Sequence, residues 1–231
     1  MTGGVAPGVS VVMIARNGAA FIVDALNSVF RSRLRPLEVL VIDGGSTDDT
    51  AAVAAAVPGV TVIAQASCGI SAAYNEGVAL ARGDLLAFLS CDDLWLPGKL
   101  DRQVPLMQAD PGLHYSFTMA EHFLQPGCAP PPGFRRTLLD RPVPGMLPET
   151  MIARPAAFAR VGGFDPALAV GGDTDWFARA RDAGLKMALL PEVLLRKRVH
   201  GANTSLADPQ INGQLLTVLR DSLARKRAAA G

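Results

Sequence analysis

The sequence predicts an α/β protein built on a single doubly wound, mostly parallel sheet. In the first ninety residues, short apolar segments alternate with segments whose apolar residues recur at helical spacing. The apolar segments are rich in β-branched residues and lack polar alternation, which is typical of strands buried on both faces. Strands that alternate with helices at this spacing form β-α-β units, and these units build parallel sheets.

The first part of the chain is expected to contain four strands and three helices. The strands are predicted at 9–14, 37–42, 60–64 and 85–89. Apolar residues at helical spacing predict a helix over 21–30, and another over 71–81. The polar run Ser46-Thr47-Asp48-Asp49 supplies capping side chains for a third helix, which reaches Val57 and stops at Pro58-Gly59.

The second half of the chain has a different pattern. One long strand is predicted over 113–124, followed by a proline-rich stretch over 126–155 that we expect to be surface loop. Its segment 126–148 is the one candidate for low complexity. A short helix at 175–183, strands at 187–190 and 194–199, and a terminal helix over 211–226 complete the prediction.

Composition excludes several classes of protein. The 231 residues are 49% hydrophobic and 19% charged, with a net charge of +1, so neither disorder nor a broad nucleic-acid-binding surface is expected. No apolar run approaches the roughly 20 residues of a membrane-spanning helix, and no signal peptide is recognisable. The three cysteines lack metal-ligand spacing. We therefore expect a cytoplasmic protein, with no nucleic-acid partner.

Polar residues follow three of the predicted strands, at the sheet edge where open α/β proteins bind ligands. Asn17 follows the first strand, Asp43 ends the second, and Ser90, Asp92 and Asp93 follow the fourth. Carboxylates gathered at one edge favour a hard divalent cation such as Mg²⁺ or Mn²⁺. For Asp43 the alternative is a helix cap. Neither a dinucleotide-binding glycine motif nor a P-loop is present.

Six segments carry a resemblance to a known family, in one order along the chain. They are VSVVMI at 9–14, VIDGGSTDDT at 41–50, 69–84 with GISAAYNEG, FLSCDDLW at 88–95, 162–177 with GGFD and GDTDWF, and RVHGANTS at 198–205. This set resembles the family 2 inverting glycosyltransferases, which have the GT-A fold. The resemblance implies one sheet with a nucleotide-binding first half and an acceptor-binding second half.

The resemblance also implies roles for individual residues. Asp173 matches the catalytic base, and Asp92 matches the last aspartate of the DxD motif, which holds Mn²⁺ or Mg²⁺ against the donor diphosphate. His200 matches a position that ligates the metal in some relatives, although a structural histidine is the alternative. Asp173 has the alternative of a helix cap. The implied donor-binding residues are Ala15, Asn17, Asp43, Asn75, Ser90 and Asp92.

Three positions depart from the family pattern. Ser90 stands where many relatives have the first aspartate of the DxD motif, so it cannot supply charge to a metal. Tyr74 replaces a frequent arginine, and Gly172 replaces an acidic residue that often precedes the base. These changes question strong metal dependence. They leave open an inactive, nucleotide-binding scaffold protein as the alternative function, and a nucleotidyltransferase of similar topology ranks below it.

The expected reaction is one transfer from a nucleotide sugar, first of all a UDP-sugar, to an unidentified acceptor hydroxyl. The QxxRW motif of processive synthases is absent. The acceptor could be a saccharide, a lipid-linked molecule, a peptide or a small molecule. Met146 and Trp176 are weak candidates for acceptor contacts, with core packing as the alternative for Trp176. The segment 126–148 is either a mobile lid or a surface loop without a role.

The expected domain organisation is one glycosyltransferase domain over 1–205 and a C-terminal amphipathic helix over 206–231. Within the domain, about 9–112 would bind the nucleotide sugar, and 113–205 would bind the acceptor and carry the base. Three interpretations of the terminal helix are open: packing onto the domain, a homodimer contact, or a weak contact with the inner membrane surface.

Overall fold

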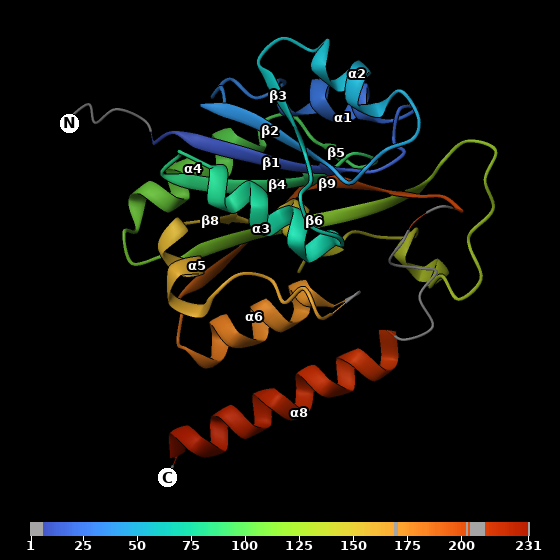
Figure 1. Cartoon of the computed structure of the whole chain (residues 1–231). Helices are drawn as coiled ribbons and strands as arrows, with labels where there is room; N and C mark the ends of the chain where they lie inside the picture. Colours follow the sequence, from blue (N-terminus) through green and yellow to red (C-terminus); the bar gives the residue numbers. More distant parts are fainter. Residues whose placement is uncertain (1–6, 169–170, 202, 204–210, 231) are drawn as a thin grey trace.

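The computed structural model describes residues 7–168, 171–201, 203 and 211–230, and within the last segment the side chains of 218–227. It contains a mixed, mostly parallel sheet between two layers of helices (Figure 1). The predicted α/β fold class is therefore confirmed. The expected boundary between 205 and 206 lies outside the described residues, as do Ala202, Thr204 and Ser205 of the last matching segment and the side chains of Ile211 and Leu215.

The first half of the chain follows the predicted alternation. Its elements are β1 (Val9–Ala15), α1 (Ile22–Val29), β2 (Glu38–Asp43), α2 (Thr50–Ala55), β3 (Val60–Ala64), α3 (Ile70–Leu80), β4 (Leu85–Ser90), β5 (Leu94–Trp95) and α4 (Lys99–Ala109). The four strands β3, β2, β1 and β4 lie side by side and are parallel. Helix α4 was not predicted.

The second half completes the sheet with shorter and less regular elements. They are β6 (Tyr115–Leu124), the 3-10 helix η1 (Arg136–Leu138), β7 (Val143–Pro144), the 3-10 helix η2 (Pro148–Thr150), β8 (Ile152–Ala153), α5 (Pro155–Val161), α6 (Gly172–Asp182), β9 (Met187–Val199) and α8 (Ile211–Ala230). The sheet order is β3-β2-β1-β4-β8-β6-β9-β5, with β7 paired to β6.

Two expectations for this half are wrong. The stretch 126–155 is not only surface loop, because its two-residue strand β8 lies between β4 and β6, antiparallel to both. The strands expected at 187–190 and 194–199 form one strand, β9, whose pairing with β6 shifts register next to Thr118 and Met119. Pro191 lies at this shift and has no N–H to donate to the ladder, which is consistent with the interruption of regular pairing there.

Alternate residues of the central strands enter two separate cores. Val9, Val11 and Met13 pack with α1, α2 and α4 on one face of the sheet. Val12 faces the other side, where α3, α5 and α6 cover an aromatic cluster. Helix α3 lies very close to β1, since a Cβ added to Gly77 would lie 2.1 Å from a methyl group of Val12. This close approach requires glycine and brings α3 to the sheet edge that carries the site.

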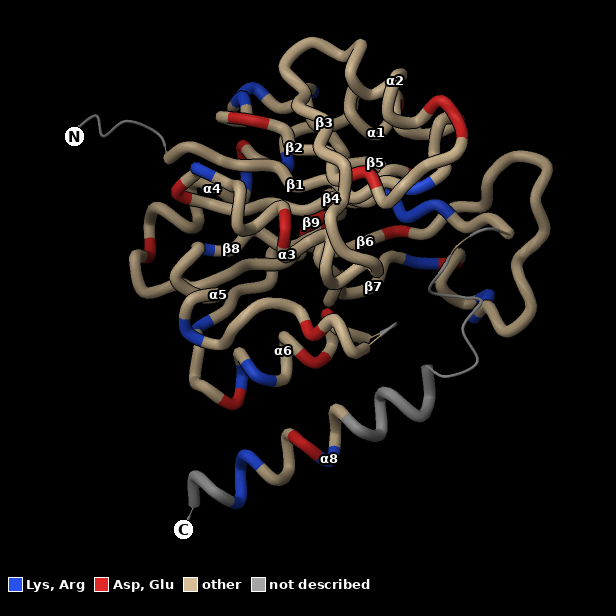
Figure 2. Tube along the Cα trace, viewed as in Figure 1, with Lys and Arg blue, Asp and Glu red and all other residues tan. Residues whose placement is uncertain are grey.

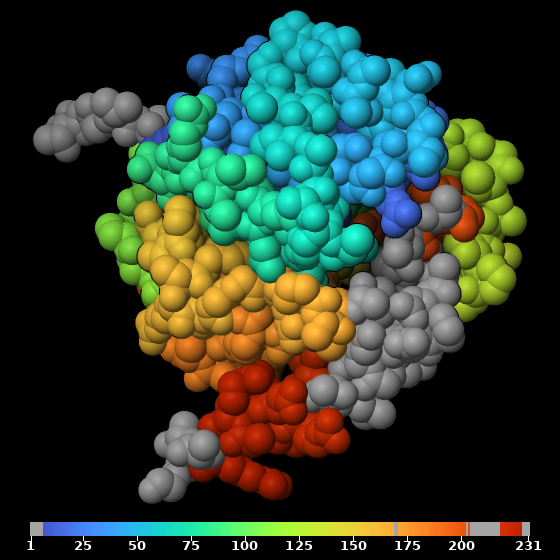
Figure 3. Space-filling model, in the orientation of Figure 1, coloured from blue at the N-terminus to red at the C-terminus, as the bar shows by residue number. Residues whose placement is uncertain are grey.

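Helix α8 lies against α6 on the side away from the sheet (Figures 1 and 3). Ser222 Oγ and Arg225 Nε both donate hydrogen bonds to Asp182 Oδ2, at 2.8 and 3.0 Å. Val218 is buried at this contact, whereas Leu219 is 57% exposed. Val218, Ser222 and Arg225 thus pack onto the domain, and the homodimer and membrane interpretations of α8 remain untested.

Charged side chains are mixed over the molecule, with blue and red segments interspersed (Figure 2). Within the described residues, no helix combines the length and the apolar character that crossing a bilayer requires.

Candidate functional site

The parallel strands bring the polar residues of the expected donor site to one edge of the sheet. Ile14 of β1 is level with Ile42 of β2 and with Ser90 of β4. The residues that follow these three strands therefore meet at one level, as in other open α/β sheets. Ala15 is buried at the end of β1, and its carbonyl accepts a hydrogen bond from Gly44 N.

Asp43 and Asn17 organise the loop that follows β2. Asp43 accepts hydrogen bonds from Ser46 N at 3.0 Å and from Ser46 Oγ at 2.5 Å. Asn17, in a left-handed conformation with φ of 51°, accepts one from Thr47 N at 2.8 Å and donates its own N–H to Ser46 Oγ. These contacts fix the loop between β2 and α2. Asp43 closes a turn rather than capping a helix, because α2 begins only at Thr50.

Asn75, expected at the donor, joins two parts of the chain. Its Nδ2 donates to Phe164 O at 2.7 Å, and its Oδ1 accepts from Phe164 N at 2.8 Å. A Cβ on Gly163 would lie 2.5 Å from Asn75 Oδ1, so glycine is required for this close contact. Both ends of the Asn75 amide are thus engaged in holding the segment before α6 against α3.

Asp92 lies directly beside His200, as the resemblance implies for two ligands of one metal. His200 Nε2 is 3.1 Å from Asp92 Oδ2, and Asn203 Nδ2 donates to the same oxygen at 3.1 Å. Burial disfavours the charged form of Asp92, but the hydrogen bond with His200 and the charge of Lys197 outweigh it, so the pKa of Asp92 lies below its ordinary value. Asp92 is therefore a carboxylate at neutral pH.

Arg198 positions the backbone of Asp92. Its Nε donates to Asp92 O at 2.8 Å, and its guanidinium lies 4.9 Å from the ring centres of Phe21 and Phe123. Such a stacked, hydrogen-bonded guanidinium keeps the DxD-like segment in one conformation.

Behind Asp92 lies a buried ion-pair network that was not expected from the sequence. Lys197 Nζ is 2.8 Å from Asp93 Oδ2 and 3.5 Å from Glu149 Oε1. Complete burial, together with the charges of Asp92 and Glu149, raises the pKa of Asp93, while Lys197 opposes this shift. The N–H of Arg198 donates to Asp93 Oδ1 at 2.8 Å. Asp93 is thus a structural partner of β9.

Ser90 connects this network to α3. Its Oγ donates to Glu149 Oε1 at 2.8 Å and lies 3.3 Å from the hydroxyl of Tyr74. Two of the three positions that depart from the family pattern, Ser90 and Tyr74, therefore contact each other. The carboxylate absent at position 90 is present one hydrogen bond away, on Glu149.

Asp173 lies in the first turn of α6, where its Oδ1 accepts a hydrogen bond from Thr174 N at 2.7 Å. Burial raises the pKa of Asp173, the negative charge of Glu149 adds to the increase, and Lys197 counters it. A carboxylate whose pKa is raised toward neutrality accepts a proton more readily than an ordinary one. Asp173 is thus a carboxylate whose pKa lies above its ordinary value.

The two weak acceptor candidates are placed differently. Trp176 has no exposed surface, donates from Nε1 to Gly162 O and packs on Phe158 at 4.7 Å between ring centres. Trp176, a weak candidate for an acceptor contact, therefore has no exposed surface to offer, and core packing, its alternative, accounts for the residue. Met146 is exposed and lines a hollow of about 480 Å³ together with Thr174, Phe177 and Leu219.

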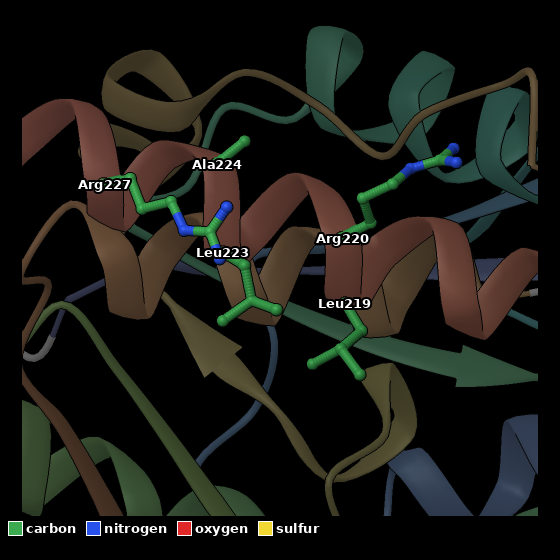
Figure 4. A pocket seen from close by; sticks show the side chains of 5 residues that line it. All are labelled: Leu219, Arg220, Leu223, Ala224 and Arg227. Carbon is green, nitrogen blue, oxygen red and sulfur yellow. The ribbon is translucent and has the colours of Figure 1, made fainter.

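A second depression lies on α8, and Leu219 lines both it and the first hollow. Its lining consists of Leu219, Arg220, Leu223, Ala224 and Arg227, and none of these side chains is acidic or hydroxylated (Figure 4).

Sequence reasoning missed Glu149 and Lys197. Lys197 lies in the run Arg196-Lys197-Arg198 of a strand, and alternation along a strand must turn at least one of three successive cations inward, where it needs an acidic partner. Glu149 gave no such signal, because it lies at the end of the proline-rich stretch.

Among the described residues, no group of three or more His, Cys, Asp and Glu side chains could hold a metal ion.

Comparisons with known proteins identify the fold. The chain resembles residues 1–349 of S. aureus TarS in complex with UDP-GlcNAc, with a TM-score of 0.73, 16% identity, and coverage of 94% of this chain and 66% of that chain. It also resembles the mannosyltransferase PcManGT of Pyrobaculum calidifontis in complex with GDP-Man and Mn²⁺, with a TM-score of 0.63, 19% identity, and coverage of 98% and 64%. These likenesses establish the GT-A fold of glycosyltransferases.

The family follows from the sequence itself. The profile of glycosyl transferase family 2 matches residues 10–127, just over half of the chain. The chain therefore belongs to glycosyl transferase family 2. It is 36% identical over 105 residues to an uncharacterised glycosyltransferase of Nostoc sp., covering 43% of this chain and 33% of that protein. It is 29% identical over 208 residues to an uncharacterised protein of Mycobacterium tuberculosis, covering 83% and 59%. The chain is thus much shorter than these relatives.

Proposed function

We propose that the chain transfers one sugar residue from a nucleotide-sugar donor to an acceptor hydroxyl, with inversion at the anomeric carbon. The observation that carries the proposal is the meeting of Asp92 and His200 with Glu149, Lys197 and Asp173 at one edge of the sheet of a family 2 protein. The donor half, 9–112, supplies Asp92, and the second half, 113–205, supplies the other four side chains.

Asp173 is the proposed general base. It takes the proton of the acceptor hydroxyl as the acceptor oxygen forms a bond to the anomeric carbon. The bond between that carbon and the diphosphate oxygen breaks, and its electron pair leaves with the nucleoside diphosphate. The raised pKa of Asp173 supports this role, because proton transfer is most effective when the pKa of the base lies near the working pH.

Asp92 and His200 are the proposed protein ligands of Mn²⁺ or Mg²⁺. Their side chains approach to 3.1 Å, and an oxygen and an imidazole nitrogen are ligands that Mn²⁺ accepts. Two protein ligands are few, so diphosphate oxygens would have to complete the shell. When bound, such an ion offsets the charge that develops on the leaving diphosphate.

The donor proposed first is a UDP-sugar, in line with the nucleotide sugar bound in the TarS structure. GDP-sugars remain the second candidate, because the PcManGT structure contains GDP-Man. For Asp43 and Asn17 we propose contacts with the nucleoside, since the loop that they hold follows β2 at the same sheet edge. The acceptor is proposed to lie in the hollow that Met146 and Thr174 line, because Thr174 directly follows Asp173 in the sequence.

A calorimetric titration with UDP, GDP, dTDP and CMP, each with and without Mn²⁺, tests the proposal. One nucleoside diphosphate should bind more tightly with Mn²⁺, and Asp92→Asn should remove that gain. The same protein incubated with the matching nucleotide sugar should release nucleoside diphosphate, at least by transfer to water. Binding of a nucleotide without any turnover would favour the scaffold alternative, and no binding at all would refute the proposal.

A further inference from the structure

Glu149 lies on a segment that is held rigidly, although the proline-rich stretch precedes it. Trp95 Nε1 donates to Glu149 O at 3.0 Å. Lys99 Nζ and Gln103 Nε2 both donate to Thr150 O at 3.0 Å. These three donors come from buried side chains, so the backbone of η2 is fixed from the core side. The position of the Glu149 side chain is therefore set by the fold.

Among the described residues, hydrogen-bond or ion-pair partners are found for one of the two Glu149 carboxylate oxygens. Oε1 accepts a hydrogen bond from Ser90 Oγ at 2.8 Å and lies 3.5 Å from Lys197 Nζ. Oε2 is buried and, within the described part of the chain, has no hydrogen-bond partner. A buried carboxylate oxygen without a donor is costly, and native proteins rarely keep one without a reason. We therefore consider a ligand that donates a hydrogen bond to Oε2.

The place of Glu149 indicates which ligand that is. Ser90, the hydrogen-bond partner of Glu149, precedes the proposed metal ligand Asp92 by two residues. The negative charge of Glu149 acts on the proposed base Asp173. In the proposed reaction, the transferred sugar must lie between the diphosphate and the base. The hydroxyl groups of that sugar are the O–H donors brought to this place. In the proposed complex, the nucleoside and the diphosphate lie on the other side of the sugar from Asp173.

We propose that Glu149 is a specificity-determining residue, whose Oε2 accepts a hydrogen bond from a hydroxyl group of the donor's transferred sugar. The proposal rests on the proposed function. Ser90 and Lys197 hold Oε1, so the carboxylate cannot turn away when a sugar lacks the matching hydroxyl. A site built around a buried polar group rejects such an analogue strongly, because that group is then left unpaired.

The test compares the binding of the intact donor with that of the bare nucleotide. Wild type, Glu149→Ala and Glu149→Gln are titrated calorimetrically with UDP, UDP-GlcNAc and UDP-glucose, and with GDP and GDP-mannose, all in Mn²⁺. The control is Glu192→Gln, which neutralises an exposed glutamate paired with Arg102. Thermal unfolding of each variant is measured alongside the titrations. If Glu149→Ala does not fold, the binding data of Glu149→Gln test the proposal.

The expected result is a selective loss. Glu149→Ala should weaken the donor that wild type binds by about tenfold or more, as expected for a hydrogen bond to a charged group, while the bare nucleotide binds as before. Glu149→Gln should show a smaller loss, since an amide oxygen still accepts, and Glu192→Gln should match wild type. Equal losses for nucleotide and donor, or no loss for the donor, would overturn the role of Glu149. If wild type binds no nucleotide, the proposed function itself fails, and with it this inference.

Discussion

Replacing Lys197 by methionine should destabilise the protein far more than the loss of an exposed ion pair would. Lys197 lies between Asp93, which has no exposed surface, and Glu149, whose side chain is 8% exposed. Methionine has a similar length, so the substitution removes the charge and leaves most of the packing. Two buried carboxylates then remain beside Asp92 without their shared cation.

The magnitude follows from the burial of the pair. Removing one partner of a buried ion pair costs about 3–5 kcal/mol, because the remaining charge is left uncompensated. Asp93 retains the N–H of Arg198 as a hydrogen-bond donor, so we expect the lower end, about 3 kcal/mol of unfolding free energy. For a chain of this size, that corresponds to a fall in Tm of roughly 6–12 °C.

Thermal unfolding of matched variants measures this effect. Lys186→Met is the control, because Lys186 also pairs with an aspartate, Asp110, at 2.6 Å, but both side chains are exposed. Its loss should stay below about 1 kcal/mol. The double variant Asp93→Asn with Lys197→Met removes both charges and keeps an acceptor for Arg198 N, so it should recover about half of the stability that Lys197→Met loses. Equal losses for the two lysine variants, or a double variant no more stable than Lys197→Met, would refute the reasoning.

Asp173→Asn should slow nucleoside diphosphate release from the donor by about a hundredfold or more and leave nucleotide binding unchanged; a substantial residual rate contradicts the base assignment. The acid limb of the wild-type pH–rate profile should lie above the ordinary aspartate pKa of 3.8, because burial and Glu149 raise the pKa of Asp173. Glu149→Gln should move that limb to lower pH, and an unmoved limb would speak against the coupling. Asp182→Ala removes the acceptor of Ser222 and Arg225, so hydrogen exchange of α8 should accelerate at least tenfold; unchanged protection would mean that apolar packing alone holds α8.

The positions of the parallel strands along the chain could be predicted because each of them carries a local signal. β1 and β2 are mostly apolar runs, and α1, between them, has regular apolar spacing. β8 could not be predicted, because two residues are too few for any periodicity, and they pair only with strands distant in the sequence. Helix α4 contains Pro105 and buries Lys99 and Gln103, so its apolar face is incomplete in the sequence.

The residues of the candidate site also differ in whether a local sequence signal marks them. Asp92 and Asp173 could be proposed because they lie in recognisable segments, directly after β4 and at the start of α6. Glu149 and Lys197 were not predicted as site residues, because their significance depends on a contact between residues 48 positions apart in the sequence. The distinction between Asp92 and its neighbour Asp93 also required the structure. The first contacts His200 at the sheet edge, and the second is buried against β9.

The charges in this network bear on whether Ser90 abolishes metal dependence. Asp92, Asp93, Glu149 and Asp173 gather within reach of one fully engaged cation, Lys197, so the cluster has more carboxylates than lysines even though position 90 is neutral. Such an excess of negative charge in a buried place favours a bound cation or protonation of one carboxylate. Asp92 has a lowered pKa and so keeps its charge at neutral pH, with Oδ2 contacted by His200 and Asn203. If Asp92 and His200 hold a metal as proposed, the serine at position 90 reduces the number of ligands, while the neighbouring carboxylates still attract a divalent ion.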